Sequence, residues 1–283
     1  DIYLVLLLLA RKNVSELPDD LCTALTGAVT YCAWFGSDQK AIAEALYGVL
    51  ANQEVNVSRL ALALAAAKSY LYPLNRRDDV QTFIKLPDPA SADFKSWNWC
   101  QLVLDVDKDV KEAKQRRWWN FLCAIKDRKE LLLYAQRNYL VTRFKNYDPA
   151  RKDLWETHNR PWDYDHILPH AYTYNIKKDN LFMDFCKQWC NTIGNYRAWP
   201  FEDNRSDQDI KAGKKLNESL MEKSFILPDK ELAGFDQDRN ILSDANAALA
   251  FAESCKSRIV RIYDEWYKNL MLAEIVKGDV NND

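Results

Sequence analysis

Three residues in one stretch of the chain have side chains suited to hydrolysis of a phosphodiester bond. Asp165 and His166 are adjacent, and Asn204 follows further along the same stretch. Such hydrolysis needs an activated water and positive charge beside the phosphoryl oxygens. A largely neutral imidazole can take a proton from water. A carboxylate oxygen and an amide oxygen can both bind a hard divalent ion such as Mg²⁺.

These residues belong to four short strings, which are Asp165-His166-Ile167-Leu168-Pro169, Gly194-Asn195, Asp203-Asn204-Arg205-Ser206 and Lys214-Lys215. In this order the strings resemble the HNH, or ββα-metal, endonuclease family, over residues 161–216. The resemblance implies that Asp165 and Asn204 hold one Mg²⁺ or Mn²⁺ ion and that His166 faces it as general base. It also implies a structural role for Asn195, whose amide would bond loop backbone and hold the His-bearing strand in register.

Basic side chains near these strings are candidates for contacting the phosphates that flank the cut. They are Arg205, Lys214 and Lys215, with His170 as an auxiliary contact, although a surface role is the default for a histidine there. Upstream, residues 108–160 hold 14 Lys and Arg against 7 Asp and Glu, whereas the whole chain has a net charge of −2. That stretch could contact a phosphate backbone, but charge alone favours a solvated helix face.

The elements that must position these residues are predicted to be mostly helical, since only 7 Gly and 9 Pro in 283 residues argue against a turn-rich all-β protein. Residues 73–99 are predicted to form a loop or a partly ordered connection, and caps are expected at Ser37 or Asp38 and at Ser58. The predicted helices cover residues 1–72, 102–126 and 128–146, and a last helical segment follows the cap signal Ser243-Asp244.

Residues 161–216 differ from these helices. An extended segment over 162–168 stops at Pro169, a helical insert covers 179–191, and a second strand covers 193–199. A helix is then expected to begin near Ser206, with its free N–H groups toward an anion. Because neighbours on a strand point to opposite faces, Asp165 and His166 can share one site only at a strand end where the chain turns. The predicted fold is mainly α with an embedded small α+β unit, a helical array that carries a ββα-metal HNH fold.

Two domains are predicted. Residues 1–107 form a helical domain or continue a missing upstream domain. Residues 108–283 form the HNH nuclease domain, with basic helices in 108–160, the ββα-metal core in 161–216 and C-terminal helices in 217–283. More loosely, this arrangement looks like the nuclease half of GmrSD-type restriction proteins, bacterial anti-phage systems that attack modified DNA. The likeness implies DNA as partner, with an N-terminal nucleotide-binding sensor domain or a partner subunit absent from this chain.

The remaining sequence features bear on the cellular compartment of the protein and on two alternative functions. Seven scattered cysteines without a signal peptide predict reduced thiols in a cytoplasmic protein. The apolar run Leu4–Ala10 is too short to span a bilayer, so no membrane partner is expected. Two other functions stay open: a non-catalytic DNA- or partner-binding module with a degenerate HNH fold, and a nuclease directed at RNA. The presence of Asp165, His166 and Asn204 together speaks against the first.

Overall fold

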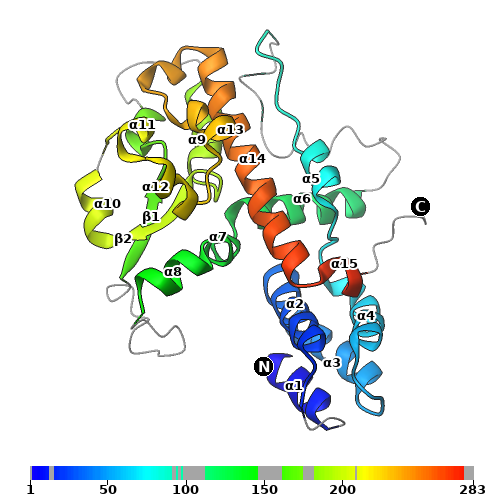
Figure 1. Cartoon of the computed structure of the whole chain (residues 1–283). Coiled ribbons are helices and arrows are strands. Elements are labelled where there is room, and N and C mark those ends of the chain that lie inside the picture. Colours follow the sequence, from blue (N-terminus) through cyan, green and yellow to red (C-terminus); the bar gives the residue numbers. More distant parts are fainter. Residues whose placement is uncertain are drawn as a thin grey trace. The chain divides into compact units, whose positions relative to one another are not determined.

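The structure is a computed structural model, and it describes residues 2–12, 16–90, 94, 97, 112–145, 161–174, 182–207 and 209–276. In these residues the protein is mainly helical, with one two-stranded antiparallel sheet (Figure 1). The predicted mainly helical class with a small sheet is therefore confirmed. No helix in this part of the chain is both long enough and apolar enough to cross a membrane.

The described residues pack into two compact units, one drawn from residues 1–80, 103–124 and 263–283 and the other from 81–102 and 125–262. The first unit contains α1 (Ile2–Arg11), α2 (Asp19–Phe35), α3 (Gln39–Leu50), α4 (Val57–Ala66) and α15 (Leu272–Ile275). Three helices contribute residues to both units, namely α5 (Arg77–Phe83), α6 (Glu112–Asp127) and α14 (Ala245–Asn269). The domain boundary predicted at residue 107, and residues 146–160 of the predicted basic segment, lie outside the described residues.

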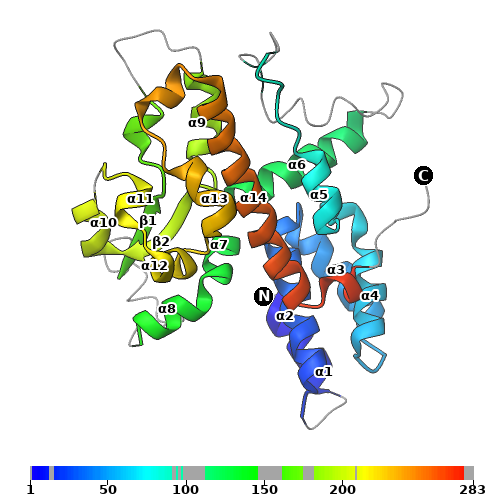
Figure 2. The same cartoon turned by 45° about the horizontal axis from the view of Figure 1, so that its top comes forward.

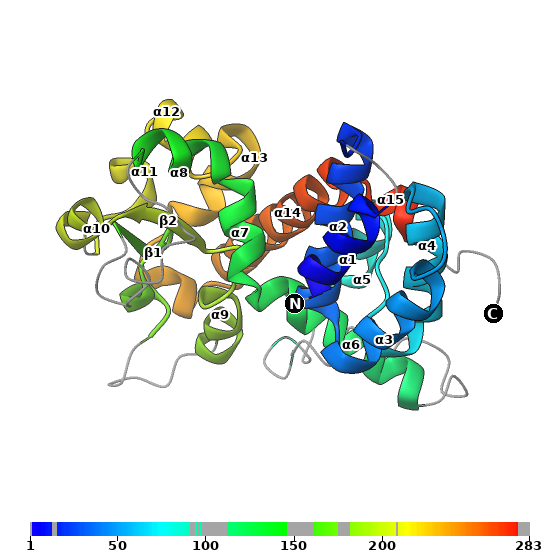
Figure 3. The ribbon, with the colours of Figure 1, turned by 90° about the horizontal axis from the view of Figure 1, so that it is seen from below.

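Helices pack side by side in the first unit, which confirms the consecutive helices predicted for residues 1–72. Figure 3 shows α2, α3, α4 and α15 as neighbours. Aromatic rings form the centre of this core, because Phe35 stacks on Trp266 at 5.1 Å between ring centroids and lies 5.9 Å from Phe121. Such rings bury large apolar areas and supply much of the hydrophobic stabilisation of a helical unit.

Two of the predicted helix boundaries are tested by the caps. The Asp38 carboxylate accepts hydrogen bonds from the N–H groups of Lys40 and Ala41, so the predicted cap of α3 is confirmed. The predicted cap at Ser58 is wrong, because Asn56 caps α4 by accepting from the Arg59 N–H. Residues 73–99, predicted to be a loop or a partly ordered connection, contain a regular helix that was not predicted, α5.

The second predicted long helix, over 128–146, is broken into α7 (Lys129–Ala135) and α8 (Arg137–Arg143). The break falls at Gln136, whose side chain is buried. Its Oε1 accepts from the Ala198 N–H, and its Nε2 donates to the Lys223 carbonyl. At the break, Gln136 therefore supplies partners to two backbone groups that are distant in sequence, the Ala198 N–H and the Lys223 carbonyl.

The sheet consists of β1 (Trp162–His166) and β2 (Tyr196–Pro200), which pair antiparallel. In the register of this pair, Asp165 lies opposite Arg197 and His166 lies opposite Tyr196. Figure 2 shows the two strands with α10, α11 (Ala212–Lys215) and α12 (Glu218–Lys223) around them. The second unit also contains α7, α8, α9 (Met183–Cys190) and α13 (Pro228–Phe235), with 3₁₀ turns η5 (His170–Tyr172) and η6 (Arg239–Leu242).

The helix after the sheet begins earlier than predicted. α10 spans Phe201–Asp207, directly after Pro200, so Asn204 lies in its middle and Ser206 lies near its end. The predicted anion site at a helix start near Ser206 is therefore wrong. The first turn of α10 carries two acidic residues, which favour a helix N-terminus through the helix dipole, and a proline commonly precedes or opens a helix.

The loop that leads into β2 is held by α14. The guanidinium of Arg258 on this helix is fully buried and has no carboxylate partner among the described residues. It donates instead to five backbone carbonyls, those of Ile193, Gly194, Tyr196, Ser224 and Phe225. Burial lowers the pKa of Arg258 to about 9. The N-cap of α14 is Asp244, which accepts from the N–H groups of Asn246 and Ala247, as the sequence predicts.

Candidate functional site

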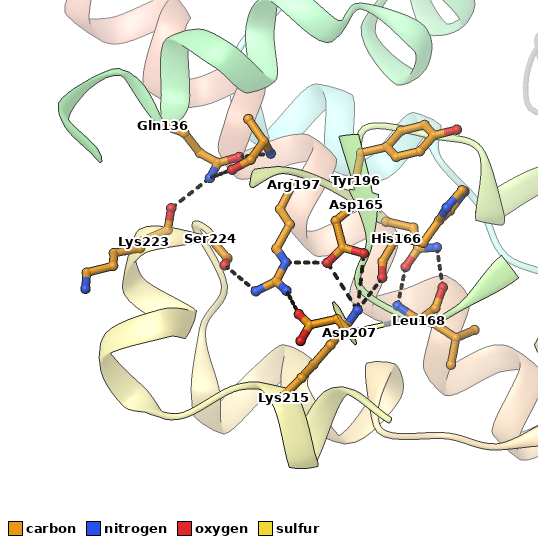
Figure 4. Close-up of polar contacts among 12 residues, drawn as sticks. Gln136, Asp165, His166, Leu168, Tyr196, Arg197, Asp207, Lys215, Lys223 and Ser224 are labelled. Atoms are coloured by element: carbon orange, nitrogen blue, oxygen red, sulfur yellow. Dashed lines mark hydrogen bonds and ion pairs between the residues drawn. The ribbon is translucent and has the colours of Figure 1, made fainter. Parts of the chain in front are cut away.

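Asp165 and His166 lie on opposite faces of β1. The strand continues through His166, which still pairs with Tyr196, so the alternation of side chains is not broken between the two residues. Figure 4 shows the Asp165 carboxylate directed toward Arg197 and Lys215. The two residues lie at the end of β1, as predicted, but the regular pairing through His166 leaves their side chains on opposite faces, so they do not converge on one site.

A buried ion network occupies the Asp165 face. The network comprises Asp165, Arg197, Asp207 and Lys215, from β1, β2, α10 and α11 (Figure 4). The Arg197 Nε lies 2.7 Å from Asp165 Oδ2, and the Lys215 Nζ lies 3.1 Å from the same oxygen. Arg197 also donates to Asp207 Oδ2 at 3.0 Å and to Ser224 Oγ at 3.4 Å. Two carboxylates thus balance two cations.

The side chains of this network are buried, so the loss of hydration of each charge must be offset by its partners. The side chains of Arg197, Lys215 and Asp165 are 0%, 1% and 5% exposed. Burial lowers the pKa of Lys215, and the neighbouring carboxylate of Asp165 acts in the opposite direction. Burial likewise raises the pKa of Asp207, against the attraction of Arg197. Each charge is retained because its partners replace the water that it has lost.

The carboxylate of Asp165 does not fit the role of metal ligand in this arrangement. Both of its oxygens accept hydrogen bonds from cations, with Lys215 Nζ at 3.1 and 3.3 Å and Arg197 Nε at 2.7 Å. A divalent ion there would add positive charge beside two buried positive charges. No hydrogen bond or ion pair within the described residues joins Asn204 to Asp165. These residues also contain no group of three or more His, Cys, Asp or Glu side chains placed to hold a metal.

The His166 face is less buried and carries neutral groups. The His166 ring is half-buried, and its Nε2 lies 3.2 Å from Asn191 Oδ1. The Tyr196 hydroxyl donates to the same oxygen, so Oδ1 is an acceptor and favours the tautomer with the proton on Nε2. Burial lowers the pKa of His166, while the Asn191 hydrogen bond acts to raise it. The ring is therefore neutral at neutral pH, with Nδ1 as its basic nitrogen.

Asn195 has the backbone-bonding role that was predicted for it. Its amide is fully buried, its Oδ1 accepts from the Leu168 N–H at 2.9 Å, and its Nδ2 donates to the carbonyls of Leu168 and Cys190. The preceding Gly194 packs against α14, where an added Cβ would lie 2.6 Å from the Cys255 carbonyl oxygen. The Gly-Asn string thus combines a close approach that excludes a side chain with a clamp on the segment after β1.

The predicted phosphate contacts separate into buried and exposed residues. The prediction that Lys215 contacts a phosphate is wrong, because its ammonium is buried in the ion network and does not reach solvent. Lys214 and Arg205 are exposed, and the Arg205 guanidinium lies 3.9 Å from the centre of the Phe201 ring. His170 is also exposed, and its ring lies 5.7 Å from that of His166. The structure therefore brings His170 to His166, and it brings Lys215 to Asp165.

Sequence reasoning missed Arg197, Asp207 and Asn191, which hold the two motif residues in place. Arg197 had a usable signal, because a charged residue beside Ala198 in a short strand needs a partner, and an opposite charge across the ladder supplies one. Asn191 and Asp207 had no such signal, since their contacts depend on how the loop before β2 and the helix after it are packed.

Comparisons with known proteins do not assign this site. The chain matches no protein-family model, no curated protein and no solved structure. The roles of Asp165 and His166 therefore rest on the contacts made within the chain.

Proposed function

We propose that this chain is an HNH-type endonuclease that hydrolyses phosphodiester bonds in DNA, with His166 as proton acceptor. One observation carries the proposal: the Asp-His-Ile-Leu-Pro string begins with the last two residues of β1, the first strand of a strand–strand–helix unit of β1, β2 and α10, and Asn195 clamps the Leu168 backbone within the string. His166 is the chemically competent member of the string, because its half-buried ring still reaches solvent and burial keeps it neutral. Restriction of foreign DNA in bacterial anti-phage defence is the setting that the resemblance suggests.

The reaction would proceed on the His166 face. A water oxygen attacks the phosphorus while His166 Nδ1 takes its proton, and the bond from phosphorus to the 3′-oxygen breaks. The leaving oxygen takes a proton from solvent, which gives 5′-phosphate and 3′-hydroxyl ends. Asn191 holds the ring through Nε2. Lys215 donates to the His166 carbonyl at 2.8 Å, so the ion network fixes the backbone that carries the base.

The metal requirement implied by the resemblance stays a prediction. Both oxygens of Asp165 are committed to Arg197 and Lys215, so no step above is assigned to Mg²⁺ or Mn²⁺. Asp165 acts in this proposal as a positioning residue, through Lys215 and the backbone of His166.

The test is plasmid nicking by the purified chain in Mg²⁺, in Mn²⁺ and in EDTA. We expect His166→Ala to lower the cleavage rate by about 10²- to 10⁴-fold, the usual contribution of a positioned general base. Tyr47→Ala, at a residue of the first unit that is 56% exposed, is the control and should retain the wild-type rate. Equal rates for wild type and His166→Ala would refute the assignment. A folded wild-type chain that binds DNA without cleaving it would support the non-catalytic module instead.

A further inference from the structure

Five rings form a continuous strip across the His166 face of the second unit. We define the aromatic strip as Tyr164, Tyr196, His166, His170 and Tyr174, in that spatial order. Successive ring centroids lie 6.0, 4.6, 5.7 and 6.3 Å apart. Each of these side chains is half-buried or exposed, and Tyr174 is 38% exposed. The strip joins both strands to the segment after β1, and His166 lies at its centre.

Lysine ammonium groups lie over both ends of the aromatic strip. The Nζ of Lys129 on α7 lies 4.3 Å from the centre of the Tyr164 ring and 5.0 Å from that of Tyr196. The Nζ of Lys187 on α9 lies 4.7 Å from the centre of the Tyr174 ring. Lys129 is exposed, and the ion pair of Lys187 within the described part of the chain is a loose surface pair with Asp184 at 3.8 Å. Surface pairs of this kind are weak, so both ammonium groups can turn to an incoming anion.

The combination of rings and cations selects a ligand class. Proteins that hold single strands stack successive bases on aromatic side chains and meet the phosphates with basic ones. Paired bases in a duplex keep their faces covered by their neighbours and offer nothing for such rings to stack on. An aliphatic protein partner would not require ammonium groups at both ends of the strip.

We infer that the aromatic strip, with Lys129 and Lys187, binds a single-stranded segment of DNA and places its central phosphodiester at His166. The choice of DNA over RNA rests on the proposed function. Bases would stack on the tyrosines toward each end, and the two lysines would contact phosphates on either side of the cut. The opposite face of β1 cannot serve, because the ion network there is buried.

The test measures binding of a fluorescein-labelled oligo-dT of about 12 nucleotides, within the site sizes usual for such surfaces, by anisotropy in EDTA. A hairpin duplex and an oligo-rU of equal length are compared at low and moderate salt. Tyr174→Ala should weaken oligo-dT binding by about 10-fold, as expected for the loss of one stacked base. Lys129→Gln should weaken it by about threefold and flatten its salt dependence.

Matched controls come from the first unit, where Tyr47 is 56% exposed and the Lys40 side chain is 87% exposed. Tyr47→Ala and Lys40→Gln should bind like wild type, and circular dichroism checks that each variant is folded. The inference is overturned if Tyr174→Ala and Lys129→Gln bind as these controls do, or if the duplex binds more tightly than oligo-dT. Tighter binding of oligo-rU would overturn the choice of DNA.

Failure of this inference is distinguishable from failure of the proposed function. Plasmid nicking that depends on His166 but is unchanged in Tyr174→Ala would refute the binding role of the aromatic strip and would support the nuclease proposal. Oligo-dT binding that depends on Tyr174, in a chain that never cleaves DNA, would support the binding role of the strip and would refute the nuclease proposal.

Discussion

The two faces of β1 differ more than their single-residue separation suggests. On one face, Asp165 is 5% exposed and its partners are the charged side chains of Arg197 and Lys215. On the other face, His166 is half-buried. Its neighbours there are the side-chain amide of Asn191 and aromatic rings. The first environment is that of a structural element, because its groups have exchanged water for one another. The second is that of a surface whose polar groups still reach solvent, as the proposed function requires.

Adjacent residues of one motif can therefore have separate physical roles that are joined by a third residue. Lys215 is that link, since its Nζ contacts the Asp165 carboxylate and also donates to the His166 carbonyl. A substitution on the buried face should change the stability of the fold, and any change in activity should follow from that change in stability. A change on the His166 face should alter activity with little change in stability. The predictions below test this separation.

The largest expected effect is on the free energy of unfolding. Asp165→Ala leaves Arg197 and Lys215 buried with only Asp207 as counter-charge, and breaking a buried pair in this way costs about 3–5 kcal/mol. His166→Ala removes a half-buried ring and should cost about 1 kcal/mol or less. Urea denaturation followed by circular dichroism measures both. Similar losses in the two variants would show that the faces do not differ as described.

Asp165→Asn is the control for shape, and it also tests the metal. Asn keeps an oxygen for one cation but removes the charge, so an intermediate loss of stability is expected. Because Asp165 is committed to cations, wild type and Asp165→Asn should bind Mn²⁺ equally weakly in a calorimetric titration. Tight Mn²⁺ binding that disappears in Asp165→Asn would restore the predicted ligand role of Asp165.

A smaller effect separates two adjacent lysines that the sequence treats alike. Lys215→Met fills similar volume but leaves Asp165 with one cation and the His166 carbonyl without its donor, which should cost about 1–3 kcal/mol. Lys214→Met changes an exposed residue and should leave the urea midpoint where it is. If Lys214→Met lowered the midpoint as much as Lys215→Met, the burial assigned to Lys215 would be wrong.

Local pattern was enough to predict much of the framework. The extended segment over 162–168 predicted the first strand, and the cap signals at Ser37 or Asp38 and at Ser243-Asp244 predicted two helix starts. The family resemblance implied the backbone-bonding role of Asn195. The two caps are hydrogen bonds between residues near in sequence, which local pattern can specify. The clamp joins Asn195 to Leu168 across 27 residues, and its prediction came from the resemblance.

The orientation of the site residues was not predictable in the same way. Strand alternation placed Asp165 and His166 on opposite faces, but only the pairing of His166 with Tyr196 shows that the strand has not yet ended there. The role of Asp165 depends on its ion pair with Lys215. Lys215 lies on a short helix whose placement results from packing in the second unit. Such contacts depend on tertiary structure, and the types of the two residues do not specify them.

The smallest expected effect on stability lies at Asn191, which is exposed. Asn191→Ala should leave the urea midpoint unchanged. It removes the hydrogen bond that raises the pKa of His166 against burial, so that pKa should fall further below its ordinary value. An NMR titration of the His166 ring measures this shift, and plasmid nicking should slow several-fold because the ring loses its orientation. A His166 pKa that rises, or a midpoint that falls as far as in Lys215→Met, would mean that the His166 face shares the structural role of the Asp165 face.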